Sequence, residues 1–408
     1  FVRSPVGMTM QACRQDDIRL TTLGFSAYRY RLAAFVLAGA IAGIGGFLLI
    51  NLDAYLSPSL FDWRISGIIT MIVVVGGVGT LLGPVIGAFL YLLVEELTSR
   101  YTDHWLVIFG LLLLAVSLGW KRGVYGVIES TITRRRRRQE HAVRNSDRPN
   151  TPAPSYRDPA KSSAVGRQPE DVPALLSAAG LRASYGSSQT LFDISFSVGA
   201  GEVVALIGRN GMGKTTTVNA IMGMLPQTTG TIQFAGRSIA NQPSHRIARC
   251  GLGLAPEGRQ IFPTLTTREN LIVLARPPSF GRGVGWTLER VFALFPVLSE
   301  RAEQRAATLS GGEQQMLAIG RALMTNPTLL ILDEATEGLA PRIRQQILNS
   351  LAALKSSGLS ILLVDKNIKA LSGLVDRYYV IERGRVAWSG NNSELRHNWQ
   401  EVRRYLTI

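Results

Sequence analysis

The stretch VVALIGRNGMGKTTTVNAIMGML, residues 203–225, joins five apolar residues to a glycine-rich turn and then to a polar run. The apolar residues Val203–Ile207 predict a buried strand, and the polar run after the turn predicts a helix. The turn fits the spacing Gly-x4-Gly-Lys-Ser/Thr of a phosphate-binding loop, at Gly208, Gly213, Lys214 and Thr215. A strand, a loop of this kind and a helix in that order predict an α/β nucleotide-binding domain.

Each residue type in this loop has a chemical reason to be there. Glycines let backbone N–H groups wrap phosphate oxygens, and the following helix directs its positive end toward the anion. Lys214 is expected to reach the terminal phosphates, and the Thr215 hydroxyl to bind Mg²⁺. The other predicted nucleotide-binding residues of the loop are Asn210, Gly211 and Thr216.

A second buried strand is predicted in PTLLILDEA, at Leu329–Leu332, and it is followed by two carboxylates. Asp333 at the strand end can hold Mg²⁺ together with Thr215. Glu334 can orient or deprotonate the water that attacks the phosphate. We therefore predict Glu334 and Lys214 as catalytic residues, Thr215 and Asp333 as metal ligands, and ATP and Mg²⁺ as cofactors.

Between these two motifs lies LSGGEQQMLAIGRALM, residues 309–324. Ser310, Gly311 and Gly312 are expected to open a helix, which creates a second anion-binding N-terminus. This stretch resembles the signature of the ATP-binding cassette superfamily. The resemblance implies that the signature helix binds the γ-phosphate of ATP held by a partner subunit, so that hydrolysis requires a dimer of cassettes.

Further positions match that family one at a time. Tyr185 matches the aromatic residue that stacks on adenine, although a core tyrosine is an alternative. Glu257 lies in the γ-phosphate sensor loop, where the family usually has glutamine, and Asn367 ends the switch strand, where it usually has histidine. EGLAP, residues 337–341, matches the dimer-facing loop. The two departures predict a cassette that is the weaker half of an unequal pair, although both could be neutral substitutions.

Residues 175–408 resemble the second of two ATPases in bacterial importers of branched-chain amino acids. That resemblance implies a P-loop α/β domain with a helical subdomain at about 258–326. The motifs DEAT and VDKN differ from the more usual DEPS and VEQN.

The first third of the chain is strongly apolar, with long stretches at Leu32–Leu52, Ser66–Val94 and Trp105–Trp120. Such lengths favour membrane-spanning helices over the core of a soluble domain. Residues 32–125 resemble the C-terminal part of a permease of the same import system, and residues 1–31 resemble its cytoplasmic coupling helix. Full permeases of this type have more spans, and this chain starts at Phe1, near that coupling segment; the upstream helices are therefore expected to be missing or to be supplied by another chain.

Basic residues flank the apolar region on both sides, which predicts that both flanks are cytoplasmic and that the number of crossings is even. Three stretches would give an odd number. The middle stretch carries VGGVGTLLGP, residues 75–84, whose glycines and proline are expected to break it into two short helices. The alternative is one glycine-rich helix packed closely on a neighbour.

Residues 126–174 predict a basic, Pro- and Ser-rich linker between the two domains. Its five consecutive arginines, Arg134–Arg138, favour anionic lipid headgroups beside a membrane span. Nucleic acid is not expected as a partner, because no base-recognition signature accompanies the net charge of +15. A solvated charge run is the plain alternative. Cys13, Cys250 and the scattered histidines predict neither a disulfide framework nor a metal site.

Together these features predict a multidomain chain: an α-helical transmembrane fragment joined to an α/β P-loop ABC ATPase domain. The expected function is ATP-driven import of branched-chain amino acids across the bacterial inner membrane, multi-pass, with the ATPase in the cytoplasm. The expected partners are a second ABC ATPase subunit, a second permease subunit and a periplasmic solute-binding protein. The alternatives are an importer of urea or short amides, a soluble cassette ATPase that acts on nucleic acid, and a fusion remnant that transports nothing.

Overall fold

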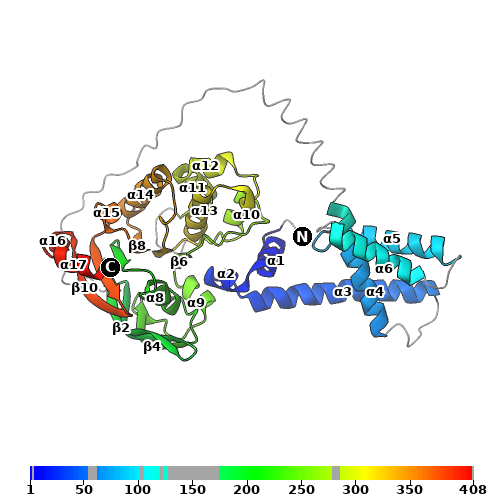
Figure 1. The fold of residues 1–408 in the computed structure, drawn as a ribbon, viewed down its shortest axis with the longest axis horizontal. Helices are drawn as coiled ribbons and strands as arrows, with labels where there is room; N and C mark the ends of the chain where they lie inside the picture. The colour runs from blue at the N-terminus through cyan, green and yellow to red at the C-terminus, as the bar shows by residue number, and fades with distance from the viewer. Residues whose placement is uncertain are drawn as a thin grey trace, which may run out of the picture. The chain divides into compact units, whose positions relative to one another are not determined.

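The computed structural model divides the chain into two compact units, Phe1–Gly39 with Asp158–Ile408, and Ala40–Arg157 (Figure 1). The expected lipid contact at Arg134–Arg138 and nearly all of the expected linker lie outside the described residues. The structure describes residues 1, 4–53, 62–100, 105–119, 123–126, 174–277 and 285–406.

The central element of the first unit is a six-stranded sheet with the order β10-β9-β3-β8-β7-β6. Its strands are parallel except for β10, which is antiparallel to β9. Their bounds are β3 Val203–Ile207, β6 Leu252–Ala255, β7 Leu329–Asp333, β8 Ser360–Asp365, β9 Arg377–Glu382 and β10 Arg385–Asn391. The two strands predicted from sequence, at 203–207 and 329–332, are therefore confirmed.

Both faces of this sheet are covered, which explains why its strands read as continuous apolar runs. Val203, Ala205 and Ile207 belong to one buried cluster, whereas Val204 and Leu206 belong to another. Successive side chains of a strand point to opposite faces. Each apolar residue of β3 therefore has a packed environment of its own.

A second, four-stranded sheet has the antiparallel order β2-β1-β4-β5. The strands are β1 Leu176–Tyr185, β2 Ser188–Val198, β4 Gln227–Phe234 and β5 Arg237–Ser238. The helices that accompany the two sheets are α8 Lys214–Ile221, α9 Ser244–Arg249, α14 Pro341–Ser356, α15 Ile368–Leu371, α16 Asn392–His397 and α17 Trp399–Leu406.

The described residues between 258 and 326 are helical where they are regular: α10 Thr267–Ile272, α11 Leu288–Leu294, α12 Pro296–Glu300, the 3₁₀ helix η2 Ala306–Thr308 and α13 Gly311–Met324. Ser310 is the N-cap of α13, and Ser310 with Glu313 forms a reciprocal capping box. Such a box satisfies two backbone donors at a helix start. The helix predicted to open at Ser310–Gly312 is thus present.

The apolar first third forms helices α3 Ala27–Asp53, α4 Trp63–Gly76, α5 Gly83–Thr98 and α6 Trp105–Gly119. The middle stretch is divided in two, as the broken-helix expectation requires, and is not one continuous helix. Gly76 and Gly83 lie so close that a Cβ on Gly76 would fall 1.9 Å from the Gly83 carbonyl oxygen. Glycine at both positions allows α4 and α5 to pack backbone against backbone.

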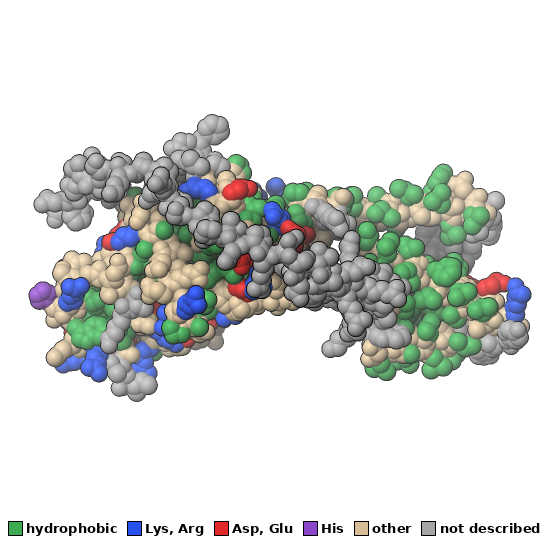
Figure 2. All heavy atoms as spheres, turned by 90° about the horizontal axis from the view of Figure 1, so that it is seen from above, with side chains coloured by type: hydrophobic (Ala, Val, Ile, Leu, Met, Phe, Trp, Pro, Cys, Tyr) green, Lys and Arg blue, Asp and Glu red, His purple; other side chains and the backbone are tan. Residues whose placement is uncertain are grey.

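Apolar side chains are widely exposed on these helices. Phe35 is 78% exposed and Phe47 is 65% exposed, and Figure 2 shows many hydrophobic side chains at the visible surface of this part. Within the described ranges, Ala27–Leu52 is the one helix long and apolar enough to cross a membrane; Trp63–Gly76 and Leu106–Val116 are shorter apolar helices. A surface of this kind fits lipid better than water.

Candidate ATP site and family

The predicted catalytic residues come together because three parallel strands end at one edge of the sheet. β3 pairs with β8 so that Ile207 faces Asp365, and β8 pairs with β7 so that Val364 faces Asp333. Ligands of open α/β sheets bind beyond the carboxyl ends of such strands. The loop that follows Ile207 and the carboxylates that follow β7 therefore share one site.

The loop after β3 has the backbone that its glycines permit. Gly211 and Gly213 have φ angles of +80° and +104°, a region that other residues enter at a cost. Gly208 is required by close packing, because a Cβ there would lie 2.4 Å from the Ile381 carbonyl oxygen. Gly213 is the N-cap of α8 and leaves the first N–H groups of that helix without a side-chain cap. Such a helix start is suited to phosphate.

Lys214 lies at the first position of α8, and only 4% of its surface is exposed. Its Nζ donates a hydrogen bond to the Arg209 carbonyl at 2.9 Å and lies 4.0 Å from a Glu334 carboxylate oxygen. Burial lowers the pKa of Lys214, whereas the charges of Glu334 and Asp333 raise it. The ammonium group is thus held inside the loop, between the Arg209 carbonyl and Glu334.

The two expected metal ligands are adjacent: the Thr215 hydroxyl donates to an Asp333 oxygen at 3.3 Å. Burial raises the pKa of Asp333 to about 6; the Thr215 hydrogen bond opposes this shift, and the charge of Glu257 adds to it. Among the described residues, no group of three or more His, Cys, Asp or Glu is arranged to hold a metal ion. One carboxylate and one hydroxyl suit Mg²⁺, which completes its shell with phosphate oxygens and water.

Glu334 follows directly and has a left-handed backbone, with φ of +52°. Strain of this kind in a non-glycine residue is concentrated at functional sites. Its N–H donates to the Val364 carbonyl at 2.9 Å, which ties the strained residue to β8. Burial raises the pKa of the Glu334 carboxyl to about 7; Glu337 and Glu257 act in the same direction and Lys214 opposes them. A carboxyl poised near neutral pH is suited to accept a proton from water.

Tyr185 ends β1 and is 50% exposed, which excludes the alternative of a core tyrosine. Asn219 of α8 donates a hydrogen bond to the Tyr185 hydroxyl at 3.3 Å, so the ring lies beside the helix that follows the loop. Asn210 and Gly211 are exposed in that loop, while Thr216 is buried in the first turn of α8. An exposed ring beside a phosphate loop remains available for stacking on a base.

The signature residues Ser310, Gly311 and Gly312 stand apart from the loop. Within the described residues, no hydrogen bond or ion pair joins them to residues 208–216. A Cβ on Gly311 would lie 2.8 Å from a nitrogen of the Arg259 guanidinium, and one on Gly312 would lie 2.6 Å from the Ile343 side chain. Gly312 is therefore packed closely against Ile343 of α14, and Gly311 lies beside the Arg259 guanidinium.

The two sensor residues occupy different surroundings. Glu257 is exposed, yet its charge raises the pKa of both Asp333 and Glu334, so it lies within electrostatic range of them. Asn367 lies two residues beyond the end of β8, and its backbone N–H donates to an Asp365 side-chain oxygen at 2.9 Å.

Two side-chain pairs in this region were not predicted from the sequence. Thr336 donates to an Asp365 oxygen at 2.5 Å, and Lys366 is paired with Glu337. They connect the loop after β7 to the loop after β8. The available signal was Asp365 at the end of the apolar run Ile361–Val364, the same pattern that marked Asp333.

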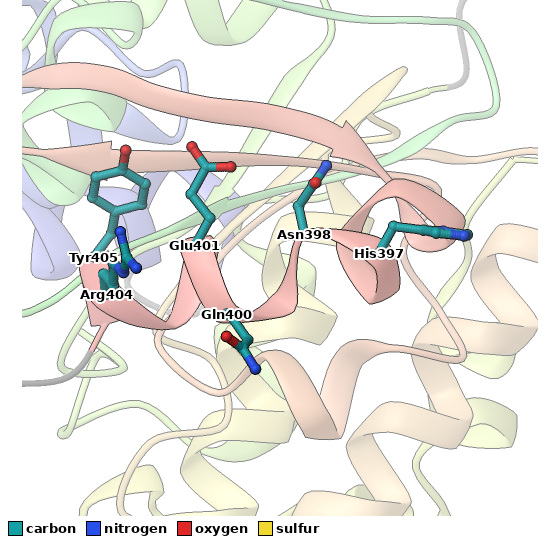
Figure 3. Close-up of a pocket in the computed structure, with 6 residues that line it drawn as sticks. All are labelled: His397, Asn398, Gln400, Glu401, Arg404 and Tyr405. Atoms are coloured by element: carbon teal, nitrogen blue, oxygen red, sulfur yellow. The ribbon is translucent and has the colours of Figure 1, made fainter.

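A polar hollow of about 510 Å³ lies elsewhere, against α16 and α17. Figure 3 shows Glu401 and Tyr405 on one side of α17 and Gln400 on the other. None of its lining residues is a predicted site residue. They are His397, Asn398, Gln400, Glu401, Arg404 and Tyr405.

Comparisons with known proteins bear on both parts of the chain. The family described as "ABC transporter" matches residues 191–337, and the family described as "Branched-chain amino acid transport system / permease component" matches residues 1–117. The high-affinity branched-chain amino acid transport ATP-binding protein BraG of Pseudomonas aeruginosa is 44% identical over 52% of this chain and 91% of its own length. The chain belongs to the ABC transporter family.

Other members of the ABC transporter family carry different names. A probable ABC transporter ATP-binding protein of Azorhizobium caulinodans is 32% identical over 62% of this chain and 89% of its own. The Nod factor export ATP-binding protein I of Paraburkholderia xenovorans is 36% identical over 53% of this chain and 70% of its own length. An ATP-binding cassette of an ABC transporter, whose crystal structure is in the ADP conformation, has 27% sequence identity to this chain. The match covers 58% of this chain and 98% of that chain, with a TM-score of 0.50.

The ABC transporter chain described here is therefore a nucleotide-binding ATPase with a permease-like N-terminal region, and it is associated with a membrane. The multidomain fold expected from the sequence, with a P-loop ABC ATPase domain and apolar N-terminal helices, is confirmed.

Proposed function

We propose that this chain is a permease–ATPase fusion that powers the import of branched-chain amino acids across the bacterial inner membrane. The observation that carries the proposal is the presence of both family matches on one chain, a branched-chain amino acid permease over residues 1–117 and an ABC transporter over 191–337. The similarity to BraG supports the same solute class. The proposed domains are 1–31, 32–125, 126–174 and 175–408.

In the proposed cycle, the loop at 208–215 and Lys214 bind the phosphates of ATP, and Tyr185 stacks on adenine. Thr215 and Asp333 would hold Mg²⁺, which neutralises phosphate charge during transfer. Glu334 accepts the proton of the attacking water. The separation of Ser310–Gly312 from this loop supports a role toward ATP in a second cassette.

The proposed complex contains a second ABC ATPase, a second permease subunit and a periplasmic solute-binding protein. The chain would be multi-pass, with its ATPase domain in the cytoplasm and Arg134–Arg138 on anionic lipid. Exposed apolar helices support this placement over a soluble cassette. Sedimentation of the chain with membranes after salt washing tests it, and a chain recovered in the soluble fraction contradicts it.

Solute identity is tested by uptake in cells that express the chain with these partners. We expect accumulation of labelled leucine, isoleucine or valine, and none when Lys214→Met removes the phosphate contact. Accumulation of labelled urea or acetamide without leucine would instead favour the alternative importer. Absence of uptake of any of these solutes by a membrane-bound, ATP-hydrolysing complex would favour a fusion that transports nothing.

We further propose that this cassette is the weaker half of an unequal pair. Asparagine at 367 keeps a hydrogen-bond donor but cannot change protonation near neutral pH as histidine can. Glu257 adds a carboxylate within electrostatic range of Asp333 and Glu334, where it repels the anionic γ-phosphate. Because both residues lie outside the phosphate loop, ATP still binds.

In a mixed dimer with a partner cassette that has the usual Gln and His, most turnover would occur at the site completed by Ser310–Gly312 of this chain. Ser310→Ala is therefore expected to lower the steady-state ATPase rate of the mixed dimer more than Glu334→Gln does. Equal losses, or a larger loss with Glu334→Gln, would show that the two sites are not unequal in this sense.

A further inference from the structure

The turn between α2 (Asp17–Thr22) and α3 is held by two arginines of the cassette. Arg276 donates to the Leu23 carbonyl, and Arg249 Nε donates to the Gly24 carbonyl at 2.9 Å. These carbonyls follow the last turn of α2, where a helix leaves its acceptors without partners. Cationic donors are the groups that stabilise such a helix end.

Arg276 joins three segments at this point. Besides Leu23, its guanidinium donates to the Ala248 carbonyl of α9 at 3.1 Å, and its backbone N–H donates to the Met324 carbonyl at the end of α13 at 3.0 Å. The guanidinium also lies 5.6 Å from the centre of the Phe25 ring. Burial lowers the pKa of Arg276 to about 10, and the charge of Arg249 acts in the same direction.

Gly24 is the complementary feature on the turn. Its φ is +89°, and a Cβ at this position would overlap the Arg276 guanidinium. Glycine is thus needed both for the backbone angle and for the close approach of the arginine. Any side chain at position 24 would displace Arg276 from the Leu23 carbonyl.

Apolar side chains of the α2–α3 segment also pack against apolar side chains of the cassette. Leu20, Leu23 and Ala27 share one buried cluster with Phe262 and Leu265 of the cassette. Ala27 is the first residue of α3, so the start of the candidate membrane-spanning helix is itself anchored on the cassette.

The same segment reaches the loop that follows Glu257. Arg19 of α2 is bonded to the Ile261 carbonyl, and its guanidinium lies 6.0 Å from the centre of the Phe262 ring. Gln15 at the end of α1 (Pro5–Gln15) is bonded to the Thr264 hydroxyl. A shift in the position of the sensor loop would therefore directly alter the contacts that α2 makes with the cassette.

We propose that Arg276 is the positioning residue that fixes the α2–α3 turn on the cassette of the same chain, so that cassette movements reach α3 within one chain. The proposal rests on the proposed function for its meaning in transport, but the docking can be measured without any solute. A half-buried guanidinium that donates to carbonyls of two segments, Leu23 and Ala248, is a stronger link than an exposed ion pair.

The test is cross-linking of the full chain in membranes between Gln15→Cys and Thr264→Cys. Cys250 is exposed and is replaced by Ser, whereas Cys13 is retained because it is buried and its thiol pKa is raised to about 11. A protease site inserted within 139–172 separates the two halves, which then stay joined only if the short bis-thiol reagent has linked them.

Arg276→Ala is expected to lower the cross-linking yield by about tenfold, and Arg276→Lys to restore part of it. The matched control is Arg268→Ala, because Arg268 is bonded to Glu303 and lies over Phe292. Binding of a fluorescent ATP analogue should be unchanged in all three variants. Full cross-linking in Arg276→Ala would overturn the proposal.

Gly24→Ala distinguishes a loss of docking from a folding defect of the cassette, because it changes the α2–α3 turn and leaves the cassette sequence intact. It should reduce cross-linking as Arg276→Ala does, and the double variant should lose little more than either single one. Additive losses would contradict a shared contact.

Exchange between copies is tested by co-expressing a Gln15→Cys chain with a Thr264→Cys chain. Docking within one chain predicts no cross-linked dimer, and an abundant dimer would overturn it. A failure of leucine uptake would leave these results intact and would affect the proposed solute alone.

Discussion

Replacing Glu334 with glutamine is expected to reduce ATP turnover by roughly 10²- to 10⁴-fold, the range for loss of a positioned proton acceptor. Glutamine has nearly the same shape, so Lys214 keeps its hydrogen bond to the Arg209 carbonyl. ATP affinity should therefore change little. The measurements are the steady-state hydrolysis rate of the assembled transporter and the binding of a fluorescent ATP analogue.

The matched control is Glu303→Gln, at an exposed glutamate whose partner is Arg268. It should leave both turnover and binding unchanged. If Glu334→Gln hydrolyses ATP at the parent rate, Glu334 is not the proton acceptor. If ATP binding is lost together with turnover, the Glu334 side chain holds the loop in its binding conformation and does not act only as a proton acceptor.

Lys214→Met is expected to weaken ATP binding by about 10- to 100-fold, which corresponds to a loss of about 1.5–3 kcal/mol for a hydrogen bond to a charged group. Methionine keeps most of the buried side-chain volume, so the fold should be retained. The loss arises because methionine carries no charge with which to replace the almost fully buried ammonium that is bonded to the Arg209 carbonyl. Equilibrium titration with the ATP analogue measures it.

Lys355→Met serves as the control. Lys355 lies near the end of α14, is paired with Asp376 and, among the residues that the structure describes, is not bonded to any predicted site residue. Its ATP affinity should equal that of the parent chain. The phosphate contact assigned to Lys214 would be wrong if the two methionine variants bound the analogue equally well.

Local patterns in the sequence were sufficient to predict the strand at 203–207, the loop after it and the helix that opens after Ser310. Each is fixed by short-range physics: an apolar run, glycines at the tight turn and a capping serine followed by Glu313. The break between α4 and α5 was predicted for the same reason, because glycines and proline interrupt residues 75–84 locally. The roles of the individual site residues remain proposals.

The pairs that join distant segments could not be predicted in this way. Arg276 lies 253 residues from Leu23 in the chain, and Thr336 meets Asp365 only because β7 and β8 are neighbours in the sheet. The apolar run before Asp365 marks that residue as a strand-end carboxylate, but sequence spacing contains no signal for which residue is its partner.

The sequence by itself predicted a phosphate-binding loop at Gly208–Thr215, and it determined that the first third of the chain is apolar enough for a membrane. Those properties depend on residue type and on spacing within one element. Only the tertiary structure decided that Asp333 and Glu334 lie beside Lys214, and that the α2–α3 turn rests on Arg249 and Arg276. Strand order and docking set those distances, and both follow from burying apolar surface across the whole domain.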